Sequence, residues 1–258
     1  KGGSFDPRGY TTAAPDIDGD GVVSDEEIYD FMAFDPEFVD SWEIGLKSNW
    51  FDGRVYTAIA VFTGDYTDVQ VSTFTEITTP QGPQFFGNFL NAGDAEVNGI
   101  EVEFIYSPAN ADWLTLSGNV NYLDAAPTRF LDENDNGLVD TQVITNAPEN
   151  TGALNAAFNF PAGNGSVIGS VGVSYRSESM LTNEGEGVEP LLQDSFSLWN
   201  ASVGYTWGYG DYSLMLHGKN VSDEYYMTNG YNIPVVGIKT GAAGTPRTVL
   251  LSFEANFD

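Results

Sequence analysis

The chain has 258 residues, with 37 Asp and Glu against 9 Lys and Arg, so its formal net charge is −28 at pH 7. This charge argues strongly against nucleic-acid binding, because phosphate recognition needs a cationic face and the basic residues are scattered singly. The 41% hydrophobic and 14% aromatic content is too high for a disordered acidic tail. Without cysteine there are no disulfides or thiolate sites. The presence of only one histidine argues against histidine-based catalysis.

Membrane insertion through helices is also excluded by the sequence. No segment approaches the roughly 18 apolar residues of a transmembrane helix, and the first residues do not form a signal peptide. A membrane β-barrel remains open, because its strands alternate apolar and polar residues and are not detected by hydropathy.

The first motif along the chain is an acidic loop at residues 16–27, with the sequence DIDGDGVVSDEE. It fits the twelve-residue EF-hand loop, which supplies oxygen ligands to calcium from positions 1, 3, 5, 7, 9 and 12. These positions hold Asp16, Asp18, Asp20, the backbone carbonyl of Val22, Ser24 (directly or through a water) and bidentate Glu27. We therefore predict a structural Ca²⁺ site, with a solvated acidic turn as the alternative.

A short helix is predicted to follow this loop at about residues 25–33. Ser24 and Glu27 have the spacing of a capping box, and Ile28, Phe31 and Met32 follow at helical spacing. Residues 10–15 are predicted to be coil, so no helix enters the loop and only half of an EF-hand is expected. Residues 1–36 as a whole are predicted to form an extended loop.

From residue 39 onward the dominant pattern is alternation of apolar and polar residues in segments of about ten residues, the length of a tilted membrane strand. In one such segment Leu114, Leu116 and Val120 alternate with Thr115, Ser117 and Asn119. The pattern predicts about nine strands: 39–50, 54–64, 97–107, 112–123, 151–161, 165–176, 197–208, 211–221 and 247–257.

A second acidic motif lies between two of these strands, at residues 132–140. It repeats the oxygen-bearing residues of the calcium loop, but position 12 is Val143, so the bidentate carboxylate is absent. A weaker calcium site and a plain Asx-rich loop are both open readings. The candidate ligands are Asp132, Asn134, Asn136, Leu138 through its carbonyl, and Asp140.

The connections between the predicted strands alternate in length. Short turns at 51–53, 108–111, 162–164 and 209–210 alternate with long segments at 65–96, 124–150, 177–196 and 222–246. Outer-membrane barrels have short periplasmic turns and long extracellular loops, so we predict an antiparallel transmembrane β-barrel. Nine strands would leave two open edges in lipid, which predicts that the chain is part of a larger barrel. A soluble calcium-dependent β-sandwich for adhesion or glycan binding is the alternative fold and function.

Four strings in the barrel region carry a family resemblance. SWEIGLKS at 41–48, NAGDAEVNGIEVE at 91–103, GKNVSDEYY at 218–226 and GTPRT at 244–248 resemble, in order and spacing, motifs of TonB-dependent outer-membrane receptors. The resemblance covers residues 37–258 and implies a 22-stranded barrel closed by an N-terminal plug. The nine strands would then be the last nine, and the plug would lie outside this chain.

The resemblance further implies active import of a scarce nutrient across the bacterial outer membrane, most similar to that of receptors for ferric siderophores or other iron complexes. The implied partners are outer-membrane lipid and lipopolysaccharide, TonB through the N-terminal part that is not in this chain, and a small-molecule nutrient. Both calcium motifs would face the cell exterior, where the abundant ion would order long loops.

Several charged residues share the polar phase of the strands and are predicted to face the barrel lumen. We interpret them as wall residues that bind one another or the plug, with substrate contact as the alternative, and we expect His217 to be a hydrogen-bonded wall residue. No nucleophile elbow or phosphate-binding loop occurs, so no enzyme is predicted. The set comprises Glu43, Lys47, Glu101, Glu103, Arg176, His217, Lys219 and Glu254.

Overall fold

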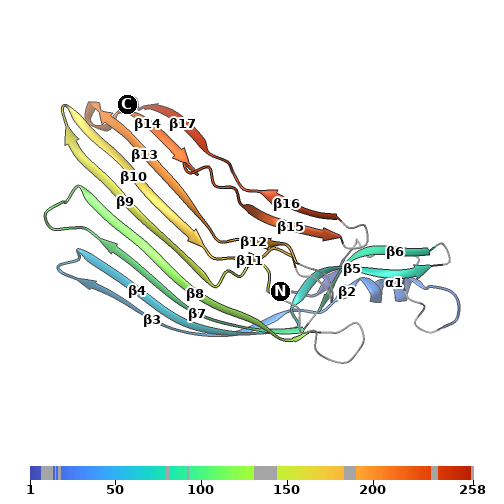
Figure 1. Cartoon of the computed structure of the whole chain (residues 1–258). Helices are drawn as coiled ribbons and strands as arrows, with labels where there is room; N and C mark the ends of the chain where they lie inside the picture. Colours follow the sequence, from blue (N-terminus) through green and yellow to red (C-terminus); the bar gives the residue numbers. More distant parts are fainter. Residues whose placement is uncertain are drawn as a thin grey trace.

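The computed structural model describes residues 1–6, 14, 16, 19–79, 82–91, 93–130, 144–182, 190–233 and 238–256. Its main element is a nine-stranded antiparallel sheet in the order β17-β14-β13-β10-β9-β8-β7-β4-β3, which follows the chain (Figure 1). The strands are β3 (Phe38–Trp50), β4 (Val55–Thr67), β7 (Gly93–Tyr106), β8 (Leu114–Phe130), β9 (Asn150–Ala162), β10 (Gly165–Arg176), β13 (Phe196–Trp207), β14 (Tyr212–Lys219) and β17 (Thr248–Ala255).

These nine strands confirm the nine predicted from the alternating pattern, and most observed ends lie within a few residues of the predicted ones. β8 differs most, because it continues to Phe130 through residues predicted to be loop. Short turns gather at one end of the sheet and long connections at the other (Figure 1). The first strand β3 and the last strand β17 form open edges, as expected for a section of a barrel wall.

The long connections contain strands that the sequence pattern did not predict. β5 (Gln70–Thr79) and β6 (Gly82–Asn91) form a hairpin within 65–96, and β15 (Met227–Ile233) and β16 (Ile238–Ala243) form another within 222–246. Two short pairs are β1 (Ser4–Phe5) with β2 (Ala33–Phe34), and β11 (Ser179–Met180) with β12 (Leu192–Gln193). Residues 70–79 are rich in Thr, Val and Ile, whose branched side chains favour strands.

The two faces of the sheet differ in chemistry, as strand alternation requires. On one face the cross-strand register joins Ile44, Val61, Ile100 and Tyr122 in a row, and a parallel row joins Leu46, Ile59, Val102 and Val120. On the opposite face Lys47 pairs with Ala58, which pairs with Glu103. Barrel walls in membranes are apolar outside and polar inside, so the first face is the outer one and the second faces the lumen.

The apolar outer face is not covered by a second layer. Ile44 is 82% exposed and Trp42 is 79% exposed, and no large side chain among the described residues is fully buried. A β-sandwich would bury this face against an opposing sheet. The soluble sandwich proposed as an alternative is therefore wrong, because the described part of the chain has only one large sheet.

Aromatic rings mark the two limits of the outer face. Trp207 stacks with Tyr205 and Tyr212 at centroid distances of 6.0 and 5.7 Å, at the short-turn end. Trp199 lies eight residues before Trp207 on β13, which corresponds to about 26 Å of strand. With a strand tilt of about 40° this gives a height of about 20 Å, near the ~25 Å apolar band of membrane barrels.

The part of the chain that the structure describes contains no helix long and apolar enough to cross a membrane.

Candidate functional site

The acidic loop of residues 16–27 leads into α1 (Asp25–Met32), as predicted. The capping box is present: the Ser24 hydroxyl accepts from the Glu27 backbone N–H at 3.3 Å, and Glu27 Oε2 accepts from the Ser24 backbone N–H at 2.8 Å. Asp25, Glu26 and Glu27 occupy the first turn, where negative charge is favourable. The box therefore fixes the start of the helix at the ninth position of the calcium motif.

The loop before the helix folds around its own carboxylates. Asp16 Oδ1 accepts from the Gly19 N–H and Asp16 Oδ2 from the Gly21 N–H, both at 2.8 Å, and Asp20 Oδ1 accepts from the Val22 N–H at 2.7 Å. Gly19 and Gly21 have φ values of 75° and 85°, a left-handed conformation that glycine adopts without strain. The chain thus makes the sharp turn that the motif predicts at Gly21.

The predicted calcium ligands are only partly described by the structure. Asp16, Asp20, Val22, Ser24 and Glu27 are described, whereas Asp18 and the whole second motif at 132–140 lie outside the described residues. Among the residues that are described, no three Asp, Glu or His side chains converge in a metal-binding group. Calcium binding at both motifs therefore stays a prediction.

The loop and helix belong to a small folded unit, which we define as residues 1–37. Its core is formed by Ala14, Ile28 and Met32, which are 3–6% exposed, with Val23 and Phe31 packed against them. β1 and β2 pair across this unit. Residues 1–36 were predicted to be an extended loop with one short helix. The described part contains that helix together with a strand pair and an apolar core, which the sequence pattern did not predict.

The 1–37 unit docks on the base of the β5/β6 hairpin through side-chain amides. Asn91 accepts from the Asp35 N–H at 2.7 Å and donates to the Asp35 carbonyl at 3.0 Å and the Asp68 carbonyl at 2.8 Å. Gln70 donates to the carbonyls of Gly2 and Asp35 at 3.1 and 2.9 Å. Sequence reasoning did not identify these residues, because their partners are up to 68 residues away.

Replacing Asn91 with Ala is expected to loosen the 1–37 unit from the hairpin. Asn91 makes two hydrogen bonds to Asp35 of the unit, and their loss removes roughly 1 kcal/mol each. Backbone amide exchange at Ala33, Phe34, Asp35 and Glu37 of the full-length protein should accelerate by about 10- to 100-fold. Asn121→Ala is the matched control, since the Asn121 amide bonds only Thr151 Oγ1 within the barrel wall, at 3.0 Å. Equal exchange in both variants would contradict the docking role.

The lumen face carries the predicted charged residues, and Glu43, Lys47, Glu101 and Glu103 are all exposed there. The ion pairs recorded among the described residues join other groups, so the prediction that these lumen charges pair within the wall gains no support. His217 is a hydrogen-bonded wall residue, as predicted, with Nε2 at 3.3 Å from Ser252 Oγ.

Two of the sequence motifs meet at the join between β14 and β17. Asn220, only 4% exposed, donates through Nδ2 to the carbonyls of Glu224 and Thr245 at 2.8 and 3.1 Å. Asp223 accepts from the Arg247 backbone N–H at 3.0 Å and pairs with its guanidinium at 3.3 Å. The residues at 218–226 and 244–248 therefore fasten the two ends of a long extracellular connection. Their role is structural and not catalytic.

The fold and its two faces define a section of an outer-membrane β-barrel. Residues 4–221 match the family described as TonB dependent receptor-like, beta-barrel, and the chain belongs to this family. Proteins of this family are transporters and not enzymes, and they lie in the bacterial outer membrane. The predicted family, fold and location are thereby confirmed.

Similar proteins include receptors for metal complexes. The metal-pseudopaline receptor CntO of Pseudomonas aeruginosa is 26% identical over 87% of this chain and 28% of its own length. The ferric yersiniabactin uptake receptor FyuA of Yersinia pestis has a similar fold, with a TM-score of 0.66 and 17% identity, over 88% of this chain and 31% of that one. The siderophore receptor PiuA of Acinetobacter baumannii gives a TM-score of 0.61 at 18% identity, over 87% of this chain and 29% of that one. The chain thus spans about three tenths of the length of these proteins.

Proposed function

We propose that the chain is the C-terminal wall of a receptor that imports a metal complex of a small organic chelator, with a ferric siderophore as the leading candidate. The observation that carries the proposal is the match of residues 4–221 to the receptor barrel family, together with relatives whose names state metal-pseudopaline, ferric yersiniabactin and siderophores as their ligands. Import is energised through TonB, which contacts a part of the receptor outside this chain.

The lumen face of the described strands carries charges of both signs. Its acidic side chains are Glu43, Glu101, Glu103 and Glu254, and its basic side chains are Lys47, Arg176 and Lys219. These charges are close to balance, so the proposed cargo class rests on the relatives and not on the charge of this wall.

Calcium is the second part of the proposed function. Asp16, Asp18, Asp20, the Val22 carbonyl, Ser24 and Glu27 would bind one Ca²⁺, which cancels part of the repulsion within the acidic loop. The support is the match at every ligand position and the turn that directs Asp16 and Asp20 into the loop. The ion would hold the 1–37 unit in one shape at the extracellular mouth, and it takes no part in transport chemistry.

Uptake by cells with and without the full-length receptor tests the import proposal. Iron, zinc and nickel are each labelled and supplied as a complex with a defined chelator. For one of these complexes, uptake by cells without the receptor should be about 10-fold or more slower than uptake by cells with it. The receptor should also increase in abundance when that metal is scarce. Unchanged uptake of every metal complex would overturn the proposed cargo class. A loss of sugar or cobalamin uptake instead would retain an importer but reassign its substrate.

A further inference from the structure

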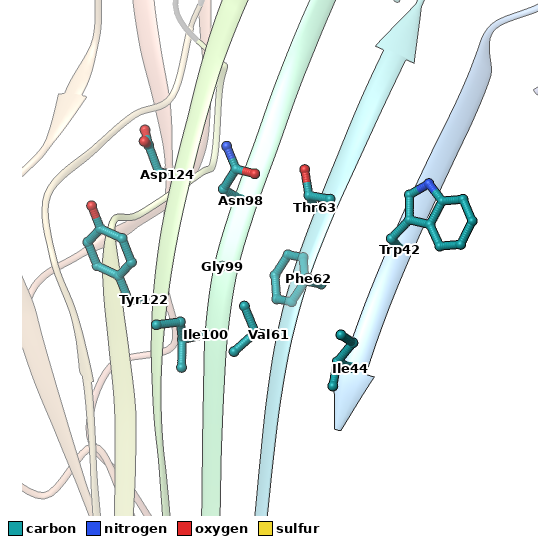
Figure 2. Close-up of a pocket in the computed structure, with 10 residues that line it drawn as sticks. All are labelled: Trp42, Ile44, Val61, Phe62, Thr63, Asn98, Gly99, Ile100, Tyr122 and Asp124. Carbon is teal, nitrogen blue, oxygen red and sulfur yellow. The ribbon is translucent and has the colours of Figure 1, made fainter. Parts of the chain in front are cut away.

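A groove of about 460 Å³ lies on the outer face of the sheet, across β3, β4, β7 and β8 (Figure 2). Trp42 and Ile44 of β3 form one side and Tyr122 of β8 forms the other. Val61 and Thr63 of β4 line the space between them. The lining is predominantly apolar, and the groove belongs neither to the lumen nor to the 1–37 unit.

The strand register explains why the surface is hollow at this point. Trp42 lies opposite Thr63, so a large ring adjoins a short side chain. The next row joins Ile44, Val61, Ile100 and Tyr122, with the larger side chains at its ends. Neighbouring strands are about 4.8 Å apart, so the four strands span about 14 Å, which is wide enough for a hydrocarbon chain.

The position of the groove relative to the membrane follows from the residues above and below it. Two residues further toward the long loops, Asp40 pairs with Asp65 and Asp65 with Glu96, and all three side chains are exposed on the same face. Three adjacent carboxylates require water or polar headgroups. Below the groove the outer face is apolar, with Leu46 and Ile59 paired. The groove therefore begins at the upper boundary of the hydrocarbon layer.

The lining of the groove changes from polar at its upper end to apolar below. Asn98 and Asp124 line its upper end, in one row with Trp42 and Thr63, and the apolar row lies beneath them. Trp42 and Tyr122 at its sides are amphipathic rings of the kind that favour the membrane interface. This arrangement matches a lipid, whose acyl chain begins at a polar ester, amide or hydroxyl group.

We propose that this groove is a specific lipid site, which holds one acyl chain of an outer-leaflet lipid with its polar linkage beside Thr63 and Asn98. The groove is continuous with the apolar face that contacts the membrane, so lipid is the occupant already present at that surface. The site rests on the outer-membrane location of the family and does not depend on the proposed cargo or on calcium.

Native mass spectrometry of the full-length receptor, extracted from its own membrane and washed with detergent, tests the site. Thr63→Trp fills the groove. The variant should retain one lipid molecule fewer per receptor, so the fraction of receptors that carry this molecule should fall by about 10-fold or more. Val203→Trp is the matched control, because Val203 is 48% exposed on the outer face of β13, away from the groove, and should retain lipid as the unmodified receptor does. The mass of the retained molecule distinguishes lipopolysaccharide from phospholipid, and either supports the site.

A second variant guards against a folding defect. Val61→Phe fills the lower part of the groove with a smaller change and should also reduce lipid retention, while both variants keep the heat-modifiable migration of a folded barrel. Equal lipid retention in Thr63→Trp, Val61→Phe and Val203→Trp would overturn the proposal. A receptor dimer that only the groove variants dissociate would also overturn it, because a second copy would then be the occupant.

Discussion

Replacing Glu27 with Gln is expected to weaken calcium binding to the full-length receptor on the order of 100-fold, while helix α1 stays folded. The carboxylate at position 12 is the bidentate ligand of the motif, and an amide supplies only one neutral oxygen. The capping box, in contrast, accepts Gln as well as Glu at this position. The amide oxygen can still accept from the Ser24 N–H and hydroxyl, which lie 2.8 and 2.9 Å from Glu27 Oε2. The substitution thus separates the metal role of Glu27 from its capping role.

Calorimetric titration with Ca²⁺, with amide exchange of α1 measured in parallel, checks this expectation. Glu26→Gln is the matched control: it removes the same charge one residue earlier, from an exposed side chain that is not a predicted ligand. Calcium should slow the amide exchange of α1 in the unmodified receptor and in Glu26→Gln at similar concentrations. In Glu27→Gln the same protection should need a much higher calcium concentration. If the two variants bind calcium equally, or if the unmodified receptor does not bind it, the site is wrong.

Substituting Gly118 with Ala is expected to destabilise the barrel by about 1–3 kcal/mol. Gly118 lies on β8 between Phe104 of β7 and Leu154 of β9, its direct partners in the register. A Cβ added there would lie 2.8 Å from the Phe104 ring, 2.7 Å from Leu154 Cδ2 and 2.7 Å from the carbonyl oxygen of Ala153. The side chains could move aside, but the carbonyl belongs to the neighbouring strand, so the ladder itself must shift.

The temperature at which the full-length barrel loses its heat-modifiable gel migration measures this effect. It should fall by several degrees for Gly118→Ala. Gly64→Ala is the control, because a Cβ at Gly64 of β4 would meet its neighbours at 3.7–3.8 Å, which is ordinary contact. The same transition temperature for both variants would show that the outer face accommodates the added methyl at Gly118, contrary to the expectation.

Local sequence signals were sufficient where the structure depends on local chemistry. Alternation predicted all nine wall strands, because a strand with one face in lipid and one in a polar lumen must alternate at period two. The start of α1 was predicted correctly, because Ser24 and Glu27 cap it within a single turn. The predicted ligand positions Asp16 and Asp20 also lie in a turn formed by their own neighbours.

Long-range arrangement could not be predicted in the same way. The β5/β6 and β15/β16 hairpins were missed because they extend beyond the membrane, where strands follow no single apolar face and long connections were expected. The docking of the 1–37 unit depends on Asn91, an amide that looks like an ordinary polar residue until Asp35 and Asp68 are placed beside it. The groove likewise depends on which residues lie opposite one another across four strands.

The sequence by itself therefore determined the class of protein, the membrane-facing phase of each strand and the start of helix α1, because periodicity and capping chemistry depend on a few adjacent residues. Only the tertiary structure decided that the N-terminal segment is a folded unit held by Gln70 and Asn91, that Asn220 and Asp223 fasten an extracellular connection, and that Trp42 and Tyr122 enclose a groove. The physical reason is that these features arise from contacts between residues separated by tens of positions, whose pairing is set by strand register and not by local pattern.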